Sequence, residues 1–84
     1  MKTFKLEILS PSKEIYKGEV KSVSVPGEKS PFQILYNHAP IISSLVKGKI
    51  KIVDANDNIS TVEIESGNVE VLKNGVLILA KVNN

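Results

Sequence analysis

His38 is the side chain best suited to acid–base chemistry, because imidazole changes charge near neutral pH and the chain has no other histidine. A catalytic or metal-binding histidine needs partner groups, and the nearest acids in sequence are Glu28 and Asp54. The chain also lacks a His-Glu-x-x-His motif, paired carboxylates at helical spacing and a glycine-rich phosphate loop. We therefore interpret His38 as a loop residue that hydrogen-bonds backbone or contacts a partner, not as a catalytic group.

A second group of candidate ligands is the oxygen-rich segment Asp54, Asn56, Asp57 and Asn58. Calcium favours clustered carboxylate and amide oxygens, but an EF-hand loop also needs a central glycine and a terminal glutamate, which this segment lacks. The same residue types form turns between strands. We predict a hairpin turn here, no metal site and no cofactor.

The basic residues argue against nucleic acid as a partner. All eleven are lysine and the formal net charge is only +2, whereas arginine is the preferred residue for bidentate phosphate and base recognition. Lys47, Lys49 and Lys51 form one basic stripe on a predicted strand. We interpret this stripe as a solvated face paired with glutamates.

Length and composition indicate one domain, residues 1–84, with an ordinary globular content of apolar residues. No cysteine is present, which excludes disulfides, thiolate nucleophiles and cysteine metal sites. The longest apolar run, Val76 to Ala80, is far shorter than a membrane span. We expect a soluble protein that reaches a membrane only through partners.

We expect these residues to lie on strands and in the turns between them. Apolar residues alternate with polar ones along most of the chain, turn residues separate the runs, and no segment has a sustained helical period. We predict an all-β fold, a small β-sandwich or flattened barrel of about seven to nine short, mostly antiparallel strands.

Two hairpins are predicted in the second half. In the first, the register with the most ion pairs places Ile52 opposite Val62 and Lys51 opposite Glu63, and a slip of two residues loses one pair. In the second, Asn74-Gly75 is the two-residue turn, with positive φ at both positions. The strand after it, Val76 to Ala80, is apolar on both faces. One face packs the core, so the other must be covered by something else.

Five segments in order resemble the N-terminal β-sandwich domain of the epsilon subunit of F-type ATP synthases. The most specific reads ILYNHAPIISSLVKG over residues 34–48, similar to the family's GILPxHAPLLxxLxxG; the others are residues 4–11, 15–20, 23–27 and 67–71. Pro31 and Gln33 stand where the family commonly has an acid and a glycine, and Tyr36 stands where proline is common. The chain stops at Asn84, where family members often continue into a helical hairpin. It thus resembles a short form, for which we expect neither autoinhibition nor ATP binding.

The resemblance implies a non-catalytic subunit of the central stalk, part of the rotor, with the gamma subunit, the membrane c-ring and the larger alpha/beta assembly as partners. It implies a peripheral position on the cytoplasmic face of the inner membrane and a role in coupling proton translocation to ATP synthesis. The residues expected in loops that contact the c-ring or gamma are Glu28, Lys29, Ser30, Pro31, His38, Ala39 and Pro40. Leu77 and Leu79 form the outer apolar face, which gamma could cover.

The alternative is an unrelated β-sandwich adaptor that binds other proteins through a sheet edge or an exposed face. A small nucleic-acid-binding barrel is a third interpretation, which would require steeply salt-dependent binding. An enzyme would need a constellation of catalytic residues that the sequence does not contain.

Overall fold

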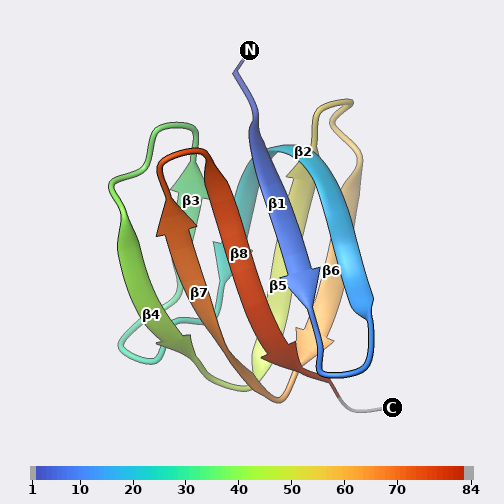
Figure 1. Cartoon of the computed structure of the whole chain (residues 1–84), viewed down its shortest axis with the longest axis vertical. Helices are drawn as coiled ribbons and strands as arrows, with labels where there is room; N and C mark the ends of the chain where they lie inside the picture. The colour runs from blue at the N-terminus through green and yellow to red at the C-terminus, as the bar shows by residue number, and fades with distance from the viewer. Residues whose placement is uncertain (1, 83–84) are drawn as a thin grey trace.

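The computed structural model describes residues 2–82, and its eight strands form one mostly antiparallel sheet that is folded into two layers and is not closed (Figure 1). The strand order is β4-β7-β8-β1-β2-β5-β6, with β3 paired to β2 on the side of this path. The pair β1–β8 is parallel. The strands are β1 Phe4–Leu9, β2 Glu14–Val25, β3 Phe32–Leu35, β4 Ile41–Leu45, β5 Gly48–Asp54, β6 Ile59–Ile64, β7 Ser66–Leu72 and β8 Gly75–Lys81. The prediction of a small all-β sandwich is confirmed.

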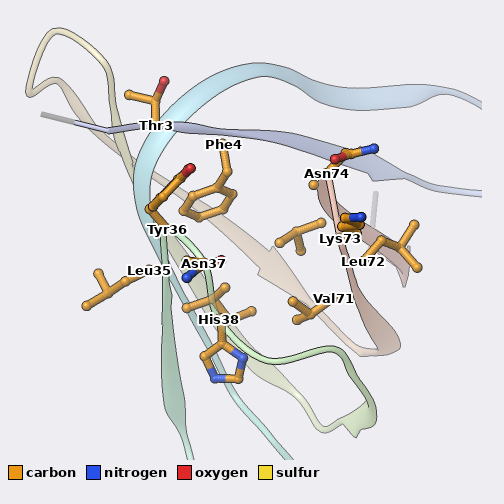
Figure 2. Close-up of a pocket in the computed structure, with 13 residues that line it drawn as sticks. Thr3, Phe4, Leu35, Tyr36, Asn37, His38, Val71, Leu72, Lys73 and Asn74 are labelled. Carbon is orange, nitrogen blue, oxygen red and sulfur yellow. The ribbon is translucent and has the colours of Figure 1, made fainter.

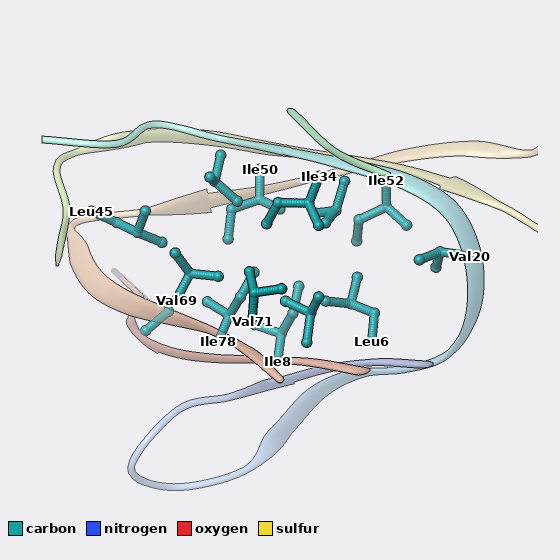
Figure 3. Packing of buried hydrophobic residues seen from close by; sticks show 14 of the residues in the cluster. Leu6, Ile8, Val20, Ile34, Leu45, Ile50, Ile52, Val69, Val71 and Ile78 are labelled. Atoms are coloured by element: carbon teal, nitrogen blue, oxygen red, sulfur yellow. The ribbon is translucent and has the colours of Figure 1, made fainter. Parts of the chain in front are cut away.

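Strand β2 joins the two layers because it is long enough to belong to both. Its first half pairs with β1, and its second half pairs with β3 and β5. Between Val20 and Ser22 the register to β5 shifts by one residue, so Lys21 is the extra residue of a bulge. A bulge bends and twists a strand locally. The chain thereby turns from one layer to the other at this bulge, next to Val20 at the curved right side of Figure 3.

The core lies between the layers and consists of the inward-facing residues of every strand (Figure 3). Ile8 and Ile78 enter it from one layer, and Val23 and Ile50 enter it from the other, all four fully buried. Each such side chain contributes about 1.5–3 kcal/mol by leaving water. Inward and outward residues alternate along the strands, so the core also fixes which residues face outward.

The register of the β5–β6 hairpin differs from the predicted one by two residues. Ile50, not Ile52, pairs with Val62, and Lys49, not Lys51, pairs with Glu63. The faces stay the same and the turn chemistry decides between the two registers. The hairpin is closed by the Asp54 amide, which donates to the Asn58 carbonyl at 3.0 Å. Fixed turn geometry outweighs one cross-strand ion pair of about 0.2–1 kcal/mol.

The β7–β8 turn also differs from its prediction. Leu72 pairs with Gly75, so the two turn residues are Lys73 and Asn74. The described residues with positive φ are Asn37 and Asp57, and neither Asn74 nor any described glycine is among them. Gly75 belongs to strand β8, where a Cβ would lie 2.9 Å from the Lys5 carbonyl oxygen. The glycine therefore serves the close approach of β1 and β8 rather than the turn. Separately, the part of the chain that the structure describes contains no helix long and apolar enough to cross a membrane.

Candidate partner-binding surfaces

The loop between β2 and β3 presents the first group of predicted contact residues. Backbone hydrogen bonds hold its base against the end of β4: the Glu28 amide donates to the Ser44 carbonyl and the Val46 amide to the Pro26 carbonyl, both at 2.9 Å. Gly27 lies in so tight a bend that a Cβ would stand 2.5 Å from the Ser30 carbonyl oxygen. The predicted contact residues Glu28, Lys29, Ser30 and Pro31 are all exposed on this fixed base.

The loop between β3 and β4 presents the second group. The His38 amide donates to the Leu35 carbonyl at 3.2 Å, and Asn37 takes the left-handed conformation with φ 66°. The His38 ring is half-buried, and its Nδ1 lies 2.7 Å from the Ala39 carbonyl oxygen. Because a carbonyl can only accept, Nδ1 carries a proton. The prediction that His38 hydrogen-bonds the backbone is confirmed, and Ala39 and Pro40 are exposed beside it.

The structure does not bring these two groups together. They lie at opposite ends of β3, a strand of four residues, and at opposite ends of the sandwich (Figure 1). The first loop meets the end of β4, and the second leads into its beginning. The predicted loop contacts therefore form two separate surfaces, and one flat partner surface at one end cannot cover both.

A third surface is the outer face of β8 and its neighbours. Leu79 is 49% exposed and pairs with Leu9 of β1, while Leu77 is half-buried and pairs with Glu7. At the beginning of β8, Leu72 is exposed across from Gly75. We call Leu9, Leu72, Leu77 and Leu79 the leucine strip. The expectation that β8 is apolar on both faces, with one face outside the core, is confirmed.

Two hollows follow the leucine strip. One, of about 580 Å³, lies over β1, β2 and the start of β8, where Gly75 leaves space beside Leu72 and Leu77. The other, of about 330 Å³, lies at the far end between Leu9, Pro11 and Leu79. An apolar strip with recesses at both ends offers shape for side chains of a partner, in addition to apolar area.

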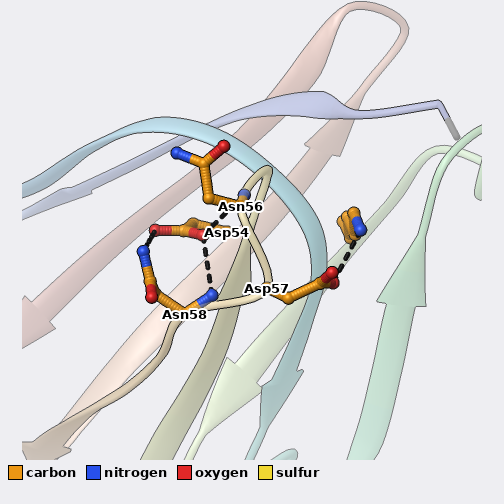
Figure 4. Close-up of polar contacts among 5 residues, drawn as sticks. Asp54, Asn56, Asp57 and Asn58 are labelled. Carbon is orange, nitrogen blue, oxygen red and sulfur yellow. Dashed lines mark hydrogen bonds and ion pairs between the residues drawn. The ribbon is translucent and has the colours of Figure 1, made fainter.

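The oxygen-rich segment forms the β5–β6 turn, as predicted (Figure 4). One carboxylate oxygen of Asp54 accepts from the amides of Asn56 and Asn58 at 2.8 and 2.9 Å. The pKa of Asp54 is lowered, chiefly by the hydrogen bond from the backbone amide of Asn58 and also by those from the backbone amide of Asn56 and the side chain of Asn58. Desolvation opposes this effect and is smaller than it. Asp57 pairs with Lys21 of the β2 bulge at 2.6 Å. These acids therefore stabilise the hairpin.

Some outward-facing residues were not predicted from the sequence. Ile42 of β4 is 78% exposed and shares a row with Glu70 and Leu77. Leu9 and Leu72 were likewise not assigned. Alternation along each strand identifies their face, but their grouping depends on strand pairing. Leu9 joins Leu79 through the parallel pairing of β1 with β8, and Ile42 joins its row through the pairing of β4 with β7, neither of which has a local signal in the sequence.

Comparison with known proteins gives consistent results. The family model described as "ATP synthase, Delta/Epsilon chain, beta-sandwich domain" matches residues 3–83. The ATP synthase epsilon chain of Campylobacter jejuni subsp. doylei is 41% identical over 76 residues, which are 90% of this chain and 59% of the relative. That of Chlorobium limicola is 38% identical over 80 residues, 95% of this chain and 91% of the relative. The chain thus spans about 59% of the length of the Campylobacter protein.

Solved structures share the fold. A chain of the Euglena gracilis mitochondrial ATP synthase, in a structure of its OSCP/F1/c-ring, superposes with a TM-score of 0.87 at 15% identity, covering 93% of this chain and 50% of that one. A chain of the Tetrahymena thermophila mitochondrial ATP synthase central stalk and c-ring superposes with a TM-score of 0.77 at 16% identity, covering 95% and 64%.

Proposed function

The chain belongs to the family of ATP synthase delta/epsilon chain β-sandwich domains, and from this membership we propose that it is a non-catalytic subunit of the central stalk of an F-type ATP synthase. As part of the rotor it binds the gamma subunit and the c-ring, turns inside the alpha/beta assembly and helps to couple proton translocation to ATP synthesis. The observation that carries this proposal is the family match over residues 3–83, which covers all eight strands.

The three surfaces suggest how such a subunit divides its contacts. The leucine strip is the apolar surface among the three, and gamma is its proposed partner. The loop with Glu28, Lys29, Ser30 and Pro31 is proposed to meet the polar loops of the c-ring. The loop with His38, Ala39 and Pro40 lies at the opposite end of the sandwich and is proposed to meet another part of the stalk. A subunit that bridges two partners needs separate surfaces, as found here.

We also propose that residues 1–84 form one domain without catalytic chemistry or a cofactor. In support, all eight strands belong to one sheet around one core. The polar side chains best suited to chemistry, His38 and Asp54, are each hydrogen-bonded to nearby backbone in a loop or turn. The proposed location is peripheral, on the cytoplasmic face of the inner membrane. Contact with the membrane is through partners only, and nucleic acid is not a partner.

Co-purification tests this proposal. The tagged chain is captured from its native membranes in a mild detergent that keeps the synthase intact, and bound proteins are identified by mass spectrometry. We expect gamma, alpha, beta and c subunits in stoichiometric amounts. Recovery of a different set of proteins, with the synthase left intact in the unbound fraction, would favour the adaptor interpretation.

A further inference from the structure

The end of the sandwich near His38 contains a pocket (Figure 2), and two of its lining residues, His38 and Leu72, also belong to the surfaces proposed above to bind partners. It opens between the loop Tyr36–His38, the β7–β8 turn and the beginning of β1, with a cavity volume of about 210 Å³. Small-molecule sites in proteins are usually about 300–1,000 Å³. A pocket of this smaller size suits a single side chain inserted by another protein.

The pocket has an apolar floor. Phe4, Ile34, Val71 and Val76 line it, and all four belong to the buried core. The base of the pocket is therefore formed by the edge of the core at this end of the sandwich. These four side chains are only 1–9% exposed, so an apolar side chain that fills the pocket gains affinity by removing its own surface from water and by packing against them.

The rim of the pocket is basic. Its ionisable lining residues are Lys73, His38 and Tyr36, and no acid lines it. Lys2 does not line the pocket, but its ammonium group lies 5.2 Å from the centre of the Tyr36 ring, so a second cation is close to the rim. The Glu19 carboxylate lies outside the lining and accepts a hydrogen bond from Thr3 of the rim at 2.9 Å. The rim thus favours a negatively charged group at the mouth.

The walls are also fixed in position. The Asn37 conformation and the hydrogen bonds of His38 to Leu35 and Ala39 hold the loop, and the β7–β8 pairing holds the turn up to Leu72 and Gly75. A preformed pocket costs little ordering when a partner binds.

We propose that this pocket anchors a loop of a stalk partner by one apolar side chain that lies next to an aspartate or glutamate. The apolar group enters the cavity and the carboxylate faces Lys73 and Lys2. This inference rests on the proposed function, since it presumes a protein partner at this end of the sandwich.

The test measures the affinity of the tagged full chain for its own synthase depleted of this subunit, at two salt concentrations. Lys73→Glu reverses the charge at the rim. Lys13→Glu is the matched control, because Lys13 is also an exposed lysine between strands but lies in the β1–β2 connection at the other end of the sandwich (Figure 1). We expect Lys73→Glu to weaken binding about three- to tenfold and to reduce its salt dependence, and Lys13→Glu to change it less than twofold. Equal melting temperatures of the variants establish that folding is unchanged.

Binding of Lys73→Glu within twofold of the unmodified chain, at both salt concentrations, would overturn the pocket proposal and leave the stalk assignment standing. Failure of the unmodified chain to bind would overturn both. A second measurement identifies the partner segment: a photo-crosslinking benzoylphenylalanine in place of Asn74 is activated in the reconstituted complex. Capture of a loop with an apolar residue next to an acid supports the proposal, and capture of a segment without an acid contradicts it.

Discussion

Replacing Gly75 by alanine should destabilise the protein, although glycine is normally unfavourable within a strand. A Cβ at this position would lie 2.9 Å from the carbonyl oxygen and 3.3 Å from the Cβ of Lys5 in the neighbouring strand β1. The first distance is shorter than folded proteins tolerate, so β1 and β8 must move apart. Gly18 is the matched control because it pairs with the adjacent residue Leu6 on the other side of β1, and its added Cβ would meet only the Tyr16 side chain at 3.6 Å or more.

The expected magnitudes follow from two opposing effects. Alanine in place of glycine restricts the unfolded chain and stabilises by about 0.4–1 kcal/mol. Overpacking costs about 1–3 kcal/mol. Gly75→Ala should therefore lose about 1–2 kcal/mol in the free energy of unfolding, whereas Gly18→Ala should gain about 0.4–1 kcal/mol because only the first effect applies. One kcal/mol corresponds to about 4–8 °C in Tm for a domain of this size.

Urea unfolding and thermal melts of the full chain measure both variants. Asn74→Ala completes the set, because a turn residue without positive φ should tolerate alanine within about 0.5 kcal/mol. Equal effects of Gly75→Ala and Gly18→Ala would refute the close approach of β1 and β8. A loss well above 0.5 kcal/mol for Asn74→Ala would restore the positive-φ turn that the sequence suggested.

Further predictions address the core, the turn and the surfaces. Ile78→Ala, which empties a fully buried position, should lower the free energy of unfolding by about 2–5 kcal/mol in urea titrations; a loss below 1 kcal/mol would argue against the packing described. The hydrogen bonds that lower the pKa of Asp54 stabilise the fold above the unfolded pKa of about 3.9, and this stabilisation is lost as the pH falls through the folded pKa. Asp54→Ala should therefore flatten the acid side of the curve of stability against pH, and an unchanged curve would contradict this. Leu79→Ser should weaken binding to the subunit-depleted synthase at least tenfold with little change in Tm. The control Thr61→Ser, on an exposed position of the other layer, should change neither the affinity nor the Tm. Equal affinities of the two variants would show that gamma does not bind the leucine strip. Burial, and secondarily the charge of Asp54, raise the pKa of Tyr16. In the variant Tyr36→Phe, the absorbance of the remaining phenol should therefore titrate above the ordinary pKa of about 10. Titration at or below that value would contradict the burial of Tyr16.

Much of the fold follows from alternation along the strands. Phe4, Leu6 and Ile8 are all buried, and Lys5 between them is exposed, as the two-residue period predicts. Inward and outward faces were therefore predictable one strand at a time. The β5–β6 register was not, because the two candidate registers keep the same faces and differ only in weak cross-strand pairs, whereas the Asp54 turn decides between them.

The candidate surfaces were predictable only in part. The residues of each loop could be named from the sequence. The path of β3 places the 28–31 and 38–40 loops at opposite ends of the sandwich (Figure 1), and the sequence alone does not show this. Leu9 joins Leu79 through a parallel pairing of strands that are far apart in sequence. The pocket near His38 likewise needs three segments that only the tertiary structure brings together. Long-range pairing carries this information, and no local pattern encodes it.

We propose that the chain turns with the rotor, and a cross-linking experiment tests this rotation. The chain has no cysteine, so Leu79→Cys introduces a single thiol on the leucine strip, to be paired with a cysteine in gamma or in alpha or beta of the reconstituted synthase. We predict that a disulfide to gamma forms and leaves ATP hydrolysis unchanged, because the two subunits turn together, and that any disulfide to alpha or beta stops hydrolysis until it is reduced. Continued hydrolysis with the chain fixed to alpha or beta, or loss of hydrolysis with the chain fixed to gamma, would contradict the rotor assignment.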